Sequence, residues 1–298
     1  MCLLYATLRT RYPLTVVRRR FIRISYAEFC KSPYNIIMKE NIIMKETSSI
    51  TEFTPNSFRE FYLSCDAIPA EYRTDVLADR CTGIAGKLLE NNEKFNLTTI
   101  TAPDEVLYKH ILDSLLSALT VRELTEGIAA PRLLDIGSGA GFPALPIAAA
   151  EPTVRVIAVD ATAKKCAHMN ETADAIGIAN FSAISARAEE LASEALHREA
   201  YDIVTARAVA NLPVLAELCL PFVKIGGYFV AMKGTSAPEE LEAARAGIGK
   251  LGGKCADLRL YAVPGDPNPR YFLIIQKISP TPAAYPRQFA KIKKNPLH

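Results

Sequence analysis

A glycine-rich turn in the middle of the chain constrains the fold more than any other feature. The segment reads LLDIGSGAGFP from Leu133 to Pro143, an apolar stretch followed by the start of a helical one. Gly137, Gly139 and Gly141 let the backbone turn tightly and let a ligand approach it closely. Such a turn between a strand and a helix is typical of nucleotide-binding α/β folds.

The pattern around this turn alternates between strands and helices. Apolar, β-prone runs predict strands at residues 132–136, 154–159, 181–185, 201–205 and 228–232. Helical periodicity fills the intervals, at residues 143–150, 163–175, 188–195, 212–223 and 238–251. Alternation of this kind predicts a mostly parallel sheet with helices on both faces. Two final strands, 254–263 and 270–277, are joined by a Pro/Gly-rich turn and predict a closing hairpin, which separates methyltransferase-type sheets from simple dinucleotide-binding ones.

Composition divides the chain into parts. We expect a basic leader (1–50), a helical subdomain (51–130), a methyltransferase-type sheet domain (131–280) and a basic tail (281–298). The leader is either an organellar transit peptide or a stretch before a later start at Met38 or Met44, within the repeated hexamer NIIMKE. The net charge of +3 comes from both ends, since residues 28–280 alone carry −7. A polyanion must therefore be met by a local basic patch.

Cysteine usage and hydropathy exclude several classes of protein. The 7 cysteines are scattered without a C-x-x-C pair, which fits neither a disulfide framework nor a zinc site. No apolar run approaches the roughly 18–20 residues of a membrane-spanning helix. We expect a cytoplasmic monomer with no metal and no membrane partner.

The glycine spacing favours a cationic ligand over a dinucleotide. A dinucleotide fingerprint needs a third glycine at position 142, which is Phe142 here. Asp135, two residues before the first glycine, would repel a pyrophosphate but suits an ammonium or a sulfonium group. The residues expected to hold this ligand are Asp135, Gly137, Ser138, Gly139, Gly141 and Phe142.

Side chains after the next strands extend this site. Asp160 ends the second strand and could accept both hydroxyls of a ribose, or cap the following helix. Ala188 and Glu189, after the third strand, could hold an adenine edge or merely favour a helix start. Arg207, at the fourth strand, needs an anionic partner unless it is a solvated surface charge. Together these residues predict S-adenosylmethionine as the cofactor.

Several motifs in one order resemble the small-subunit (16S) ribosomal RNA methyltransferase G family, once called glucose-inhibited division protein B. The resemblance covers roughly residues 55–298. The motifs are FNLT (95–98), KHILDSL (109–115), LLDIGSGAGFP (133–143), RAEE (187–190), TARAVANL (205–212) and YPR with KKNPL in the tail.

The resemblance implies an α/β, Rossmann-like S-adenosylmethionine-dependent methyltransferase fold, preceded by a small helical subdomain. It also implies an enzyme that methylates N7 of a guanine in the 530 loop of 16S rRNA, with 16S rRNA or the 30S subunit as partner. Finally, it implies that Gly137, Phe142, Ala188, Glu189 and Arg207 lie where family members contact the cofactor.

The nucleophile decides which catalytic groups are needed. Guanine N7 has a free lone pair and no proton, so alignment replaces a general base. Thr205–Ala208 stands where an exocyclic amine methylase would carry Asn/Asp-Pro-Pro-aromatic. The catalytic residue therefore stays open, with His110 and Asn96 as candidates. His110 could pair with Asp113 one helical turn away, or tie the helical subdomain to the sheet.

The tail supplies the candidates for RNA binding. Arg287, Lys293 and Lys294 could contact phosphates, although a solvated charge run is the usual alternative. Two other functions stay open: a methyltransferase acting on a small molecule or protein, and a non-catalytic cofactor-sensing protein.

Overall fold

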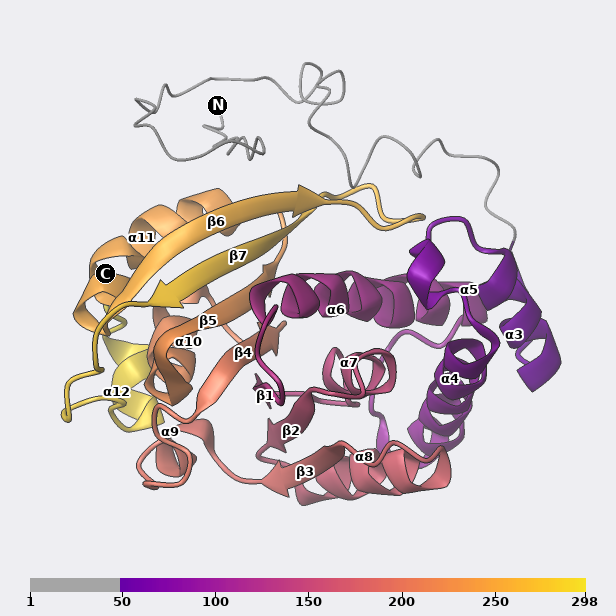
Figure 1. Cartoon of the computed structure of the whole chain (residues 1–298), viewed down its shortest axis with the longest axis horizontal. Coiled ribbons are helices and arrows are strands. Elements are labelled where there is room, and N and C mark those ends of the chain that lie inside the picture. The colour runs from indigo at the N-terminus through magenta and orange to yellow at the C-terminus, as the bar shows by residue number, and fades with distance from the viewer. Residues whose placement is uncertain (1–48) are drawn as a thin grey trace, which may run out of the picture.

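The computed structural model describes residues 49–298, so the basic leader with its repeated hexamer lies outside the described part. One twisted sheet forms the centre of this part, and helices cover both of its faces (Figure 1). The strand order is β3-β2-β1-β4-β5-β7-β6. The strands are β1 (Arg132–Ile136), β2 (Arg155–Asp160), β3 (Phe181–Ser185), β4 (Tyr201–Arg207), β5 (Val223–Lys233), β6 (Gly253–Tyr261) and β7 (Arg270–Lys277).

The strand directions confirm the methyltransferase-type sheet predicted from the sequence. Strands β1 to β5 pair in parallel. Strand β7 runs antiparallel to both β5 and β6, so a hairpin closes the seven-stranded sheet. Because parallel strands end at one edge, the loops after β1, β2 and β4 meet there.

Each face of the sheet has its own hydrophobic core, since successive strand residues point to opposite faces. Leu133 and Ile203 pack with the helices that precede the sheet and with those between β1 and β3. Leu134 and Val204 pack with the helices that follow β3 and β4 and with the tail.

The helices of the first face include two short segments, η1 and α5, and a π-helical turn, η2. They are α3 (Pro55–Ser64), η1 (Ala70–Tyr72), α4 (Asp75–Phe95), α5 (Pro103–Glu105), η2 (Val106–Leu112), α6 (Asp113–Leu124), α7 (Ala144–Ala150) and α8 (Ala163–Ala175). Those of the second face are α9 (Ala188–Leu191), α10 (Leu212–Cys219), η3 (Leu220–Phe222), α11 (Ala237–Lys250) and α12 (Phe289–Lys294). Within residues 49–298 no helix is both long enough and apolar enough to cross a membrane.

The region predicted as a helical subdomain is helical and shares its core with the sheet. Thr54 and Thr74 cap α3 and α4 with their side-chain oxygens, which accept from amides of the first turn. Phe58 and Tyr62 are fully buried and belong to the same cluster as Leu133. Secondary structure thus changes near residue 130 inside one continuous core.

Two helices are shorter than the sequence pattern predicted. Helix α9 ends at Leu191, well before residue 195. Helix α10 ends at Cys219, because Pro221 has no amide hydrogen for a regular helix and a 3₁₀ turn follows. Strand β5 then starts at Val223, ahead of its predicted start at 228.

The basic tail is packed against the sheet domain. Ile292 of α12 is fully buried, and a Cβ on Gly247 of α11 would lie 2.4 Å from the carbonyl oxygen of Leu297. The Arg287 guanidinium donates to both carboxylate oxygens of Glu217, at 2.9 and 2.6 Å. Since the Glu217 side chain is fully buried and that of Arg287 is 25% exposed, the arginine neutralises a buried charge of α10.

We therefore expect Arg287→Ala to lower the free energy of unfolding by about 2–4 kcal/mol, because it leaves the Glu217 carboxylate buried without its cation. Urea denaturation monitored by circular dichroism measures this change. Lys293→Ala, which removes an exposed charge from the same tail, is the control and should stay within about 0.5 kcal/mol of the parent. Equal stability of the Arg287 and Lys293 variants would contradict a structural role for the Arg287 pair.

Candidate active site

The glycine turn adopts a backbone that only glycine tolerates well. Gly137, Gly139 and Gly141 have φ values of 70°, 58° and 99°. A Cβ on Gly137 would lie 2.5 Å from Cγ2 of Val209, and one on Gly141 would lie 2.4 Å from Cδ1 of Leu145. Next to Gly139 the nearest atom is a backbone oxygen 4.0 Å away. A ligand can therefore reach the backbone at the middle of the turn.

Asp160 joins this turn to the end of β2. Its Oδ2 accepts from the amide of Gly139 at 3.1 Å, and its Oδ1 accepts from the amide of Thr162 at 2.9 Å. Thr162 is the N-cap residue of α8 and makes no side-chain cap bond, so Asp160 supports the helix start. The carboxylate is thus fixed beside the glycine turn, and its bond to the Thr162 amide agrees with the helix-capping alternative.

Asp135 holds a buried carboxylate oxygen that no described group satisfies. Its Oδ1 accepts from the Thr205 hydroxyl at 2.7 Å, while Oδ2 has no hydrogen-bond partner within residues 49–298. Burial raises the pKa of this side chain to about 6. An unpaired buried acceptor is costly, and a cationic or hydrogen-bonding ligand would satisfy it.

His110 and Phe142 join the helical layer to the glycine turn. The His110 ring lies in the π-helical segment η2 and stacks on Phe142, with centroids 4.6 Å apart and planes 13° apart. Its Nδ1 lies 3.2 Å from Nη2 of Arg207, which can only donate, so Nε2 carries the hydrogen and faces the Thr98 hydroxyl at 3.1 Å. Burial, aided by the Arg207 cation, lowers the pKa of His110 to about 3. The imidazole is therefore neutral at physiological pH.

Arg207 ends β4 and has a carboxylate partner within the chain. Its Nη1 donates to Oδ2 of Asp113 at 2.7 Å and to the carbonyl oxygen of Lys109 at 3.0 Å. The Asp113 carboxylate is fully buried and also binds the Tyr261 hydroxyl at 2.8 Å and the Arg270 guanidinium at 2.9 Å. The hypothesis of a His110–Asp113 pair is wrong, because these three groups occupy the Asp113 carboxylate instead.

Comparison with known proteins identifies the family of this chain. The sequence model described as rRNA small subunit methyltransferase G matches residues 82–259. The chain is 44% identical over 211 residues to ribosomal RNA small subunit methyltransferase G of Staphylococcus carnosus, covering 70% of this chain and 86% of that one. The protein of the same name from Acetivibrio thermocellus is 41% identical over 223 residues, covering 75% and 90%.

The chain belongs to the rRNA small subunit methyltransferase G family. Among solved structures, ribosomal protein L11 methylase from Lactobacillus delbrueckii subsp. bulgaricus aligns with a TM-score of 0.42 and 15% identity, covering 57% of this chain and 79% of that chain.

Of the other predicted site residues, some lie beside the glycine turn and Asp160, and others lie away from them. Ala188 and Glu189 begin α9, and the preceding Ala186 amide donates to the carbonyl oxygen of Asp160 at 3.2 Å, which places them beside the ribose-binding candidate. Asn96 is the C-cap residue of α4 and adopts a left-handed conformation with φ of 49°, so it takes part in the turn after this helix. Lys293 and Lys294 are exposed on α12, which lies far from α4 and α8 along the long axis of the molecule (Figure 1).

Sequence reasoning missed several residues that hold the site together. Thr205 and Thr98 each contact a site residue through a hydroxyl, and Tyr261 and Arg270 bind Asp113 from the closing hairpin. The two threonines belong to the motifs TARAVANL and FNLT, so these motifs could have identified them as site residues. Nothing in the sequence connects the hairpin to a helix more than a hundred residues earlier.

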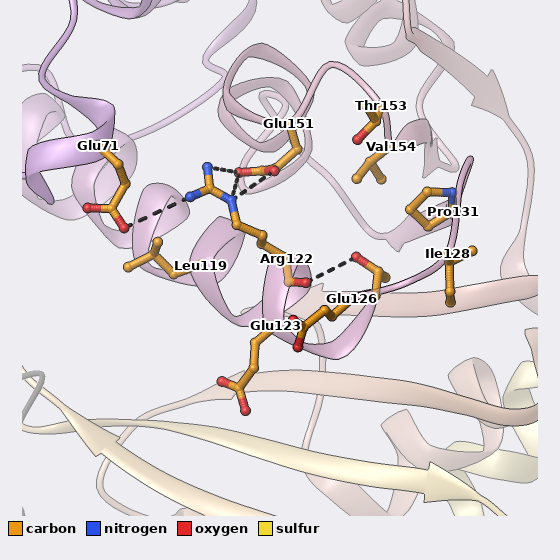
Figure 2. Close-up of a pocket in the computed structure, with 11 residues that line it drawn as sticks. Glu71, Leu119, Arg122, Glu123, Glu126, Ile128, Pro131, Glu151, Thr153 and Val154 are labelled. Atoms are coloured by element: carbon orange, nitrogen blue, oxygen red, sulfur yellow. Dashed lines mark hydrogen bonds and ion pairs between the residues drawn. The ribbon is translucent and has the colours of Figure 1, made fainter.

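A pocket of about 460 Å³ lies at the opposite edge of the sheet, where the strands begin (Figure 2). Pro131 and Val154 line it just before β1 and β2. Arg122 projects into it and binds Glu151, with Nη2 and Oε1 2.7 Å apart, while Nη1 lies 3.9 Å from Glu71. Arg122 is the one cation among the described residues of this lining, against the carboxylates of Glu71, Glu123, Glu126 and Glu151. The pocket therefore repels a polyanion and does not compete with the glycine turn as the reaction site. Within the described residues, no group of three or more His, Cys, Asp or Glu side chains could hold a metal ion.

The low pKa of His110 predicts a pH dependence of stability. In the unfolded chain His110 takes up a proton below about pH 6.5, whereas in the folded protein it stays neutral down to about pH 3. The contribution of His110 to stability is therefore fully present above pH 6.5 and is lost as the pH falls. The free energy of unfolding should fall by about 2 kcal/mol between pH 7 and pH 5.

We expect His110→Gln to remove most of this decrease in the free energy of unfolding between pH 7 and pH 5. Urea denaturation at the two pH values measures it. His298→Gln, at an exposed terminal position, is the control and should keep the parental dependence. A His110 imidazole that titrates near pH 6.5 by NMR in the folded protein would contradict the buried neutral state.

Proposed function

We propose that this chain transfers the methyl group of S-adenosylmethionine to N7 of a guanine in the 530 loop of 16S rRNA. The observation that carries the proposal is the unpaired, buried Asp135 oxygen beneath the glycine turn, with Asp160 fixed on the adjacent strand. Membership of the family supports the substrate, because its curated members are named as ribosomal RNA small subunit methyltransferases.

The residues at this edge fit the cofactor part by part. The unpaired Asp135 oxygen suits a cationic group, the open backbone at Gly139 admits a ligand, and Asp160 suits the two ribose hydroxyls. The residues that we propose for cofactor binding are Asp135, Gly137, Ser138, Gly139, Gly141, Phe142, Asp160, Ala188, Glu189 and Arg207.

The chemistry requires alignment more than proton transfer. When bound, the cofactor supplies an electrophilic methyl group on a sulfonium. Guanine N7 brings its own lone pair, so the protein has only to hold the two reactants in line and exclude water. A neutral His110 agrees with this, because a group with a pKa of about 3 takes up no proton near neutral pH. We assign His110 and Phe142 to the wall of the site and no proton-transfer role to either.

The direct test is methyl transfer from labelled S-adenosylmethionine to 30S subunits and to bare 16S rRNA, both from a strain that lacks the modification. Borohydride–aniline cleavage then maps N7-methylguanine. One new cleavage in the 530 loop would establish the reaction, the atom and the substrate together. Cofactor binding without label in either RNA would reject the rRNA assignment and favour a small substrate or a cofactor-sensing protein.

The role proposed for Asp160 predicts weaker cofactor binding in Asp160→Asn. Hydrogen bonds to a charged acceptor contribute about 1.5–3 kcal/mol, so the dissociation constant for S-adenosylmethionine should rise about 10- to 100-fold. Isothermal titration calorimetry measures this change. Asp174→Asn, the same substitution at an exposed position near the end of α8, should bind like the parent. Equal affinities of the two variants would remove Asp160 from the cofactor site.

The remaining expectations concern partners and location. We propose that the exposed Lys293 and Lys294 contact RNA phosphates at a distance from the reaction, whereas Arg287 is engaged with Glu217. An rRNA substrate also supports a cytoplasmic location. We also propose that the enzyme acts as a monomer.

A further inference from the structure

An aromatic ring is exposed beside the proposed site without a packing role that explains it. Phe95 is the last residue of α4 and is 42% exposed. The ammonium nitrogen of Lys164, an exposed residue at the start of α8, lies 5.8 Å from the centroid of the Phe95 ring. A ring and a cation presented together match the two parts of a nucleotide, the base and the phosphate.

The backbone around Phe95 is fixed. The Asn96 amide donates to the carbonyl oxygen of Asn92 at 3.1 Å, and the Thr98 amide donates to Oδ1 of Asn92 at 2.8 Å. One turn earlier, Nδ2 of Asn91 lies 3.0 Å from Nδ1 of the buried His168 and ties α4 to α8. The ring and the lysine therefore belong to two helices that are held against each other.

Both residues are close to the reaction site along the chain. Phe95 precedes Thr98 by three residues, which span at most about 10 Å, and the Thr98 hydroxyl contacts the His110 ring. Lys164 follows Asp160 by four residues, at the start of the helix that Asp160 supports. The pair thus lies at the edge of the sheet where the glycine turn opens.

We infer that Phe95 and Lys164 form a binding site for one nucleotide of single-stranded RNA next to the target guanine. The base of that nucleotide stacks on the Phe95 ring, and its phosphate contacts the Lys164 ammonium. This inference rests on the proposed function, because it takes RNA as the substrate. It supplies a positive charge near the reaction, which an acidic body requires, because helix α12 with the tail lysines lies far from α4 (Figure 1).

The test measures binding of a fluorescently labelled single-stranded RNA with the 530-loop sequence to the full chain, by anisotropy at fixed salt. Phe95→Ala and Phe95→Leu should bind about 5- to 100-fold more weakly, because both lose the ring, and Phe95→Trp should bind like the parent. Lys164→Ala should reduce the slope of log affinity against log salt by about 0.7, the value for one phosphate on a single strand.

Two controls separate these effects from the effect of removing any exposed apolar side chain or any exposed positive charge. Val76→Ala removes an apolar side chain that is 64% exposed on the same helix, and Lys254→Ala removes an exposed charge on β6. Both should bind RNA like the parent, and all variants should keep the parental affinity for S-adenosylmethionine. If Phe95→Leu binds as well as Phe95→Trp, or if Phe95→Ala matches Val76→Ala, the inference is wrong.

Methyl transfer measured in parallel keeps this inference distinct from the proposed function. A parent that methylates rRNA while Phe95→Ala neither weakens RNA binding nor raises KM for rRNA would refute only the nucleotide site. RNA binding that depends on Phe95 in a parent that methylates no rRNA would support the nucleotide site and refute the proposed reaction.

Discussion

The buried carboxylate of Asp113 is the interaction on which the architecture of the site depends. It is fully buried at the start of α6, and it binds Arg207 at the end of β4, Tyr261 at the end of β6 and Arg270 at the start of β7. One side chain therefore joins the helical layer, the central parallel strands and the closing hairpin at a single edge of the sheet. Removing it would leave two guanidinium groups largely buried without their shared anion, at a cost of about 3–5 kcal/mol.

The position of Arg207 explains how the helical layer becomes part of the site. Nη1 of the guanidinium donates to Asp113 and to the Lys109 carbonyl, and Nη2 therefore faces His110. His110 in turn stacks on Phe142, directly after the glycine turn. These residues lie in or beside a π-helical turn, a distortion that is frequent at functional sites. The helices before the sheet accordingly form a wall of the proposed active site, and they share a hydrophobic core with the sheet.

The sequence predicted the sheet and its glycine turn more completely than the contacts that organise them. Strand–helix alternation predicted the parallel strands, and two strands joined by a Pro/Gly-rich turn predicted the hairpin, because hydrophobic periodicity reports burial locally. The glycine spacing and the carboxylates at 135 and 160 pointed to a cationic, ribose-containing ligand. By contrast, the Asp113 cluster joins residues that are distant in the chain, and no local pattern encodes such contacts. The same holds for Arg287, which looked like a free tail charge and is the counterion of a buried glutamate.

The unpaired oxygen of Asp135 links the proposed cofactor binding to pH. Burial raises the pKa of this carboxyl to about 6, so below that pH the free protein stores a proton there. A cation placed at the same oxygen stabilises the ionised form and displaces the proton. If the methyl donor binds at this oxygen, as we propose, proton and cofactor compete for one atom, and the affinity for the cofactor falls as the pH falls below about 6.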